Sequence, residues 1–160
     1  MNADELSYNK VLVLNLGFDS PSKKYQKEHW VYFPDKTLNF YRIGFYNNIL
    51  NQDKLSVYVE IGFSKNAEID AEKELKEALI GMKKVGIIDD ENKLVDHSII
   101  VMDPAYVHIS KKDTELTDQL KQKLAERNIY NLGRYGSWTY NSMEDCMEMA
   151  DQLSASMKNA

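Results

Sequence analysis

The chain has 160 residues, 43% of them hydrophobic, and a formal net charge of -5, which fits one domain or slightly more and argues against binding to a nucleic-acid phosphate backbone. The single cysteine, Cys146, excludes an intramolecular disulfide framework and suits a reducing compartment. No apolar run approaches the ~18 residues of a membrane span and the amino terminus has no signal-peptide pattern, so we expect a cytoplasmic protein.

Apolar and alternating runs predict five strands along the chain. The first strand is continuously apolar at its start, from Val11 to Leu14, and is expected in the middle of a sheet with both faces buried. The next three alternate in polarity, which predicts one packed face and one face open to a ligand. The expected strands lie at about residues 10–18, 29–34, 39–47, 55–63 and 95–103.

Three helices are predicted at about residues 68–84, 113–127 and 143–157, each from an apolar stripe at helical spacing. The stripes consist of Ala71, Leu75, Ala78, Leu79 and Met82, then Leu116, Leu120 and Leu124, then Met147, Ala150 and Leu153. Antiparallel strands with helices mostly inserted late predict an α+β fold, mainly an antiparallel sheet with about three helices.

The most informative segment is GRYGSWTYNSMED, residues 133–145. We interpret its first part as a glycine-pinned loop. Gly133 and Gly136 permit backbone angles and close approaches that a Cβ would block, and Arg134 between them offers a planar, permanently charged donor.

The second part of this segment predicts a capped helix start. Ser142 followed three residues later by Asp145 forms a shortened capping box. The backbone N–H groups of Met143, Glu144 and Asp145, at the positive end of the helix dipole, would face a ligand that is negative or becomes negative. The segment therefore has the features of a cofactor contact.

This segment resembles the carboxy-terminal flavin-contacting motif of the UDP-galactopyranose mutase and protoporphyrinogen oxidase-like branch of the FAD-dependent amine oxidase superfamily. That motif runs Gly-Arg-aromatic/Leu-Gly, an aromatic pair, then Met-Glu/Asp-Asp. The resemblance implies FAD contacts for Gly133, Arg134, Gly136, Met143, Glu144 and Asp145, the last three through their backbone. The alternative is that GRYG is an ordinary β-turn and that Ser142 is an ordinary helix cap.

Other segments extend the resemblance over most of the chain, most weakly between about residues 64 and 95. The segments 29–35 and 40–43 resemble the substrate-domain hairpin of the same family. Residues 55–60 resemble its neighbouring strand, and residues 103–107 resemble the segment before the last helix. The resemblance thus implies a substrate-domain-like α+β region at 1–127, followed by the flavin-contacting motif and terminal helix at 128–160.

A dinucleotide-binding turn is missing from this sequence. Flavoenzymes of that family begin with Gly-x-Gly-x-x-Gly, and no three of the seven glycines have this spacing. We therefore expect the chain to be the carboxy-terminal portion of a longer protein, with an upstream dinucleotide-binding domain as its partner. Alone it should bind FAD weakly or not at all, and its exposed apolar surface would favour a homo-oligomer.

For the substrate, the resemblance points to the strand that carries Arg42. In the mutases an arginine on the comparable strand neighbours the substrate diphosphate, which implies substrate contacts for Arg42 together with Tyr41 or Tyr58. The alternative is that Arg42 is a solvated edge residue. The mutases carry a second arginine on the adjacent strand, where this chain reads Tyr58-Val59-Glu60, and that departure weakens the case for mutase activity.

The sequence assigns no catalytic residue and no metal site, because the three histidines have no metal-ligand spacing and no nucleophile-elbow pattern occurs. The resemblance implies part of an FAD-dependent oxidoreductase or mutase-like isomerase that acts in sugar-nucleotide or lipopolysaccharide metabolism on a nucleotide-sugar substrate. The alternative is a non-catalytic binding or interaction module that kept the fold without the cofactor.

Overall fold

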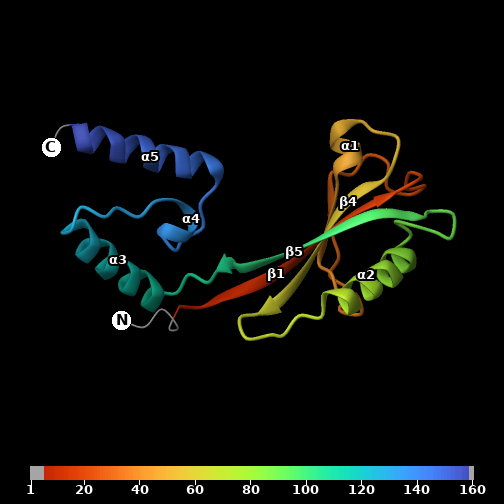
Figure 1. The fold of residues 1–160 in the computed structure, drawn as a ribbon, viewed down its shortest axis with the longest axis horizontal. Coiled ribbons are helices and arrows are strands. Elements are labelled where there is room, and N and C mark those ends of the chain that lie inside the picture. The colour runs from red at the N-terminus through yellow and green to blue at the C-terminus, as the bar shows by residue number, and fades with distance from the viewer. Residues whose placement is uncertain (1–5, 159–160) are drawn as a thin grey trace. The chain divides into compact units, whose positions relative to one another are not determined.

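A computed structural model describes residues 6–158 of the chain. Its elements in chain order are β1 (Tyr8–Phe18), β2 (Trp30–Tyr32), β3 (Arg42–Phe45), α1 (Tyr46–Leu50), β4 (Ser56–Ser64), α2 (Ala71–Val85), β5 (Leu94–Val107), α3 (Lys111–Ala125), α4 (Gly133–Gly136) and α5 (Met143–Lys158), as Figure 1 shows.

The five strands form one antiparallel sheet in the order β2-β3-β4-β1-β5, which confirms the predicted α+β class. The three long helices were predicted within a few residues of their observed ends. The short helices α1 and α4 were not predicted. Helix α1 begins inside the strand expected at 39–47. The side-chain oxygen of Asn47 accepts from the backbone N–H of Ser56 at 3.2 Å, a side-chain hydrogen bond that competes with strand pairing. The helix ends at its C-cap residue Asn51, which has a left-handed backbone with φ 53°.

The chain divides into two compact units, Lys10–Asp103 and Met1–Asn9 with Pro104–Ala160. We call them the sheet unit and the C-terminal unit. The division into a substrate-domain-like region at 1–127 and a flavin-contacting region at 128–160 stays a prediction. Strands β1 and β5 contribute residues to both units.

The sheet unit contains the hydrophobic core. Along β1, Leu12, Leu14 and Leu16 are buried, whereas Val13 and Asn15 are half-buried. The interior place of β1 in the sheet was predicted correctly. The predicted burial of both faces holds only at the start of the strand, where Val11 is fully buried as well as Leu12. The alternation of buried and half-buried residues from Leu12 to Leu16 shows that one face of β1 is fully packed.

Helix α2 covers the packed face of the sheet (Figure 1), with Leu75, Ala78 and Met82 joining the core cluster. Its stripe was predicted correctly. The Asp70 side chain accepts from the backbone N–H of Lys73 at 3.1 Å, and Gly86, with φ 77°, ends the helix. Both caps supply partners for backbone groups that the helix itself leaves unpaired.

The C-terminal unit has very little core of its own. Among its described residues the buried apolar side chains are Ala105 and Val107. The predicted inner face of α5 is confirmed for Leu153, which is half-buried, and wrong for Met147, which is 67% exposed, and for Ala150, which is also exposed. The residues of α5 that are half-buried together with Leu153 are Cys146 and Met149.

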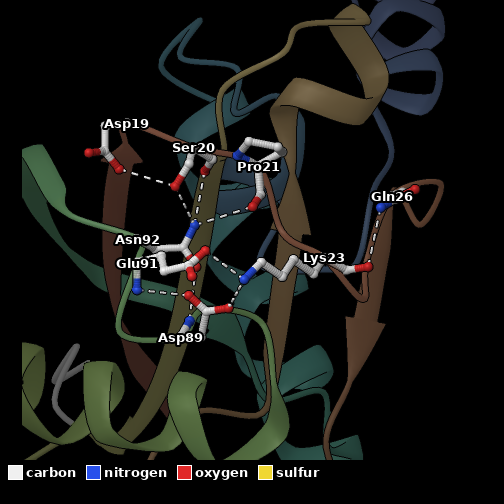
Figure 2. A network of polar contacts seen from close by, with 8 residues as sticks. All are labelled: Asp19, Ser20, Pro21, Lys23, Gln26, Asp89, Glu91 and Asn92. Atoms are coloured by element: carbon white, nitrogen blue, oxygen red, sulfur yellow. Dashed lines mark hydrogen bonds and ion pairs between the residues drawn. The ribbon is translucent and has the colours of Figure 1, made fainter.

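A polar network joins the loop after β1 to the turn before β5 (Figure 2). The side-chain amide of Asn92 donates to the Ser20 carbonyl, the Ser20 hydroxyl and the Pro21 carbonyl at 3.1, 2.8 and 3.2 Å. Lys23 contacts Asp89 at 2.9 Å and Glu91 at 2.7 Å, and the Lys23 ammonium lowers the pKa of Asp89. The carboxylates of Asp89 and Glu91 therefore hold the turn before β5 against the loop after β1.

We expect Asn92→Ala to lower the free energy of unfolding by about 1–2 kcal/mol, because several half-buried hydrogen bonds are lost together. Urea denaturation followed by circular dichroism measures the change. The control is Asp90→Ala in the same turn, whose exposed pair with Lys83 is expected to contribute less than about 0.5 kcal/mol. Equal stability of the two variants would contradict the assigned role of Asn92.

Candidate functional site

Residues 133–136 form one helical turn, α4, where the sequence analysis expected an open loop. The backbone N–H of Ser137 closes this turn on the Gly133 carbonyl at 2.8 Å. Gly133 has φ 73°, a conformation that strongly favours glycine, so its predicted role in shaping the backbone is confirmed. Gly136 is not among the residues of positive φ, and a Cβ there would meet only ordinary contacts at 3.6 Å or more.

Arg134 lies between two aromatic rings. Its guanidinium carbon is 5.1 Å from the ring centroid of Tyr106 and 4.5 Å from that of Tyr140. Such cation–π contacts fix the plane of the guanidinium and stabilise its charge. The Nε atom of Arg134 is buried and has no hydrogen-bond partner among the described residues.

Two further buried polar atoms without a partner in residues 6–158 lie three and four positions after Arg134 in the chain. They are the hydroxyl oxygen of Ser137 and the indole nitrogen Nε1 of Trp138. Each such atom costs about 1–3 kcal/mol when it is left unsatisfied, so three within five residues are unusual. Trp138 also has φ 49°, a strained conformation for a bulky residue, and strain of this kind clusters at ligand sites.

The capping box at the start of α5 is confirmed. The Asp145 carboxylate accepts from the Ser142 backbone N–H at 2.7 Å, and the Asp145 N–H donates to the Ser142 hydroxyl oxygen at 3.1 Å. The hydrogen bonds from the Ser142 backbone and hydroxyl lower the pKa of Asp145. The box thus engages the Asp145 N–H, while Met143 and Glu144 belong to the first turn, whose N–H groups have no carbonyl partner within the helix.

The structure also brings the predicted substrate residues together, on the sheet unit. Strands β3 and β4 place Arg42 directly opposite Glu60. The Arg42 guanidinium forms an ion pair with the Glu60 carboxylate, and the Tyr41 hydroxyl donates to the same carboxylate. Arg42 also donates to the Tyr32 hydroxyl at 3.0 Å. We call Tyr32, Tyr41, Arg42, Tyr58 and Glu60 the sheet-face cluster.

Tyr58 lies across Gly44, its partner residue on β3. A Cβ at Gly44 would be 2.0 Å from a ring carbon of Tyr58, so the ring occupies the space that a side chain would need. The guanidinium carbon of Arg42 is 5.9 Å from the Tyr58 ring centroid, and burial raises the pKa of Tyr58. Tyr41, Arg42 and Tyr58 were predicted from the sequence, whereas the place of Glu60 in the same cluster was not.

The comparisons with known proteins concern the fold. No protein-family model matches the sequence, and no curated protein matches it either. A crystal structure of reduced UDP-galactopyranose mutase superposes with a TM-score of 0.85 at 23% identity, covering 99% of this chain and 35% of that one. A protein from Exiguobacterium sp. 255-15, assigned as a protoporphyrinogen oxidase, superposes with a TM-score of 0.69 at 12% identity.

The second match covers 96% of this chain and 35% of the other protein. The chain thus spans about a third of the length of both solved structures. These similarities confirm the α+β fold that the sequence resemblance implied. No helix among the described residues is long and apolar enough to cross a membrane.

Proposed function

We propose that this chain is the substrate-side and flavin-contacting portion of an FAD-dependent oxidoreductase or mutase-like protein that acts in sugar-nucleotide metabolism. Its partner in this proposal is an upstream dinucleotide-binding domain, which would hold the FAD pyrophosphate. The shared fold with a portion of two larger proteins supports this proposal.

One observation carries the proposal: three buried polar atoms, at Arg134, Ser137 and Trp138, have no hydrogen-bond partner within residues 6–158. Two of them, Arg134 Nε and Trp138 Nε1, are N–H groups that can only donate, and the Ser137 hydroxyl can donate or accept. A ligand rich in carbonyl and ring-nitrogen acceptors would satisfy such a group of donors. This donor chemistry supports the proposal that the segment contacts the edge of a flavin.

A bound flavin would supply the redox or covalent chemistry, and the chain would supply placement and electrostatics. Arg134 would donate to the cofactor from a guanidinium whose plane the two tyrosines already fix. The first turn of α5 would direct the N–H groups of Met143 and Glu144, and the positive end of its dipole, toward negative charge on the ligand. The sheet-face cluster would be the substrate side.

The experiment joins the chain to a dinucleotide-binding region encoded upstream and measures FAD affinity by calorimetry. We expect the isolated chain to be colourless and the joined protein to bind flavin. Arg134→Ala should then weaken FAD binding by about 1.5–3 kcal/mol, the range for hydrogen bonds from a charged donor. The matched control is Arg127→Ala, which removes an exposed arginine of the same unit outside the motif.

Two outcomes would contradict the proposal. An unchanged FAD affinity in Arg134→Ala would mean that GRYG is an ordinary turn of the backbone with no part in flavin binding. A joined protein that folds but binds no flavin would favour a non-catalytic binding module.

A further inference from the structure

The charges of the sheet-face cluster cancel within the cluster. Glu60 is 5% exposed, and its carboxylate faces Arg42 across the β3–β4 ladder. The two form an ion pair, and the remaining members are tyrosines, of which Tyr58 has its pKa raised by burial and so stays neutral. The cluster therefore holds one positive and one negative charge.

Arg42 is also held in place by its neighbours. One of its terminal nitrogens donates to Glu60 and the other donates to the Tyr32 hydroxyl. The rings of Tyr32 and Tyr58 lie 5.6 and 5.9 Å from its guanidinium carbon. A diphosphate arriving here would meet a guanidinium whose charge is already compensated and a buried carboxylate that repels it.

The same face presents aromatic rings to solvent. The register places Trp30, Gly44 and Tyr58 in one row and Tyr32, Arg42 and Glu60 in the next. Trp30 and Tyr32, on the outer strand of the two rows, are each 58% exposed. Exposed rings of this kind stack flat, uncharged groups without requiring a charged partner.

We infer that Glu60 is a specificity-determining residue that masks Arg42 and so makes this face select an uncharged planar ring over a diphosphate. This inference rests on the proposed function only in taking the sheet face as the substrate side. For a nucleotide-linked substrate it places the base on Trp30 and Tyr32, and it places the diphosphate away from Arg42.

The test titrates the 160-residue chain with uridine and with UDP, two probes that share a base and differ in charge. The chain is labelled with 5-fluorotryptophan, and Trp30→Phe assigns the ¹⁹F signals of Trp30 and Trp138. We expect both probes to shift the Trp30 signal with dissociation constants within about threefold of each other, since stacking dominates. In Glu60→Gln, UDP should bind about tenfold tighter because Arg42 is unmasked, and uridine should be unaffected.

Several results would overturn the inference. The first is that UDP binds the wild type at least about tenfold tighter than uridine does. The second is that UDP binding is unchanged or weaker in Glu60→Gln. The third is that neither probe shifts the Trp30 signal. If Glu60→Gln does not fold, Arg42→Gln/Glu60→Gln removes both charges at once, and the UDP-to-uridine ratio should stay at its wild-type value. A parallel FAD titration of the joined protein separates this inference from the proposed function, because Glu60 is not among the residues proposed to contact the flavin.

Discussion

Replacing Phe45 by alanine is expected to lower the free energy of unfolding by about 3–5 kcal/mol, the largest effect of any single change considered for this chain. Phe45 ends β3, is fully buried, and stacks on Tyr25 with ring centroids 5.6 Å apart. Its removal costs transfer free energy, opens a cavity, and takes away one half of the ring pair. Urea denaturation followed by circular dichroism, with the slope of the transition checked for constancy, measures the loss.

Ile80→Ala is the control for Phe45→Ala. Ile80 lies on the outer side of α2 and is exposed, so its truncation should change stability by less than about 1 kcal/mol. A loss below about 1 kcal/mol in Phe45→Ala would mean that the surrounding side chains collapse into the cavity, and that the core is less tightly packed than its burial indicates.

The second large effect is expected from Arg42→Met, at about 3 kcal/mol of unfolding free energy. The change leaves the buried carboxylate of Glu60 without its cationic partner, and an uncompensated buried charge is strongly destabilising. Thermal and urea denaturation at pH 7 measure the loss.

The matched variant is Arg42→Met/Glu60→Leu, in which the ion pair is replaced by two apolar side chains. We expect it to recover most of the loss, since a buried pair often contributes little net stability compared with apolar residues of similar volume. If the double variant is no more stable than Arg42→Met, the loss of unfolding free energy comes from lost packing of the aliphatic part of Arg42 and not from the unpaired carboxylate of Glu60.

Much of the sheet unit could be predicted from local patterns. The strands and the stripe of α2 follow from apolar spacing, because their buried residues face one large core. The same reasoning failed for α5. Burial among the described residues of the C-terminal unit is slight. Of the predicted stripe only Leu153 is half-buried, so the spacing of apolar residues does not identify the side of α5 that packs.

The candidate sites were predictable in part. Ser142 and Asp145 were recognised as a capping box because such boxes depend on residues three apart. The pairing of Arg42 with Glu60 depends on the register between two strands, which the spacing of residues within each strand does not reveal. The segment Tyr58-Val59-Glu60 was noted only as a departure from the mutase pattern, and the structure shows that Glu60 within it is the ion-pair partner of Arg42. The roles proposed for Arg134 and its neighbours in flavin binding stay predictions.

The ring of Tyr58 over Gly44 has a consequence for how this sequence can change over evolutionary time. Since the ring occupies the space of a Cβ at position 44, a side chain at 44 and an aromatic ring at 58 exclude each other in this arrangement. The two positions should therefore covary among homologues, with glycine at 44 retained wherever an aromatic residue stands at 58. Substitution at either position alone would first have to pass through a less well packed intermediate.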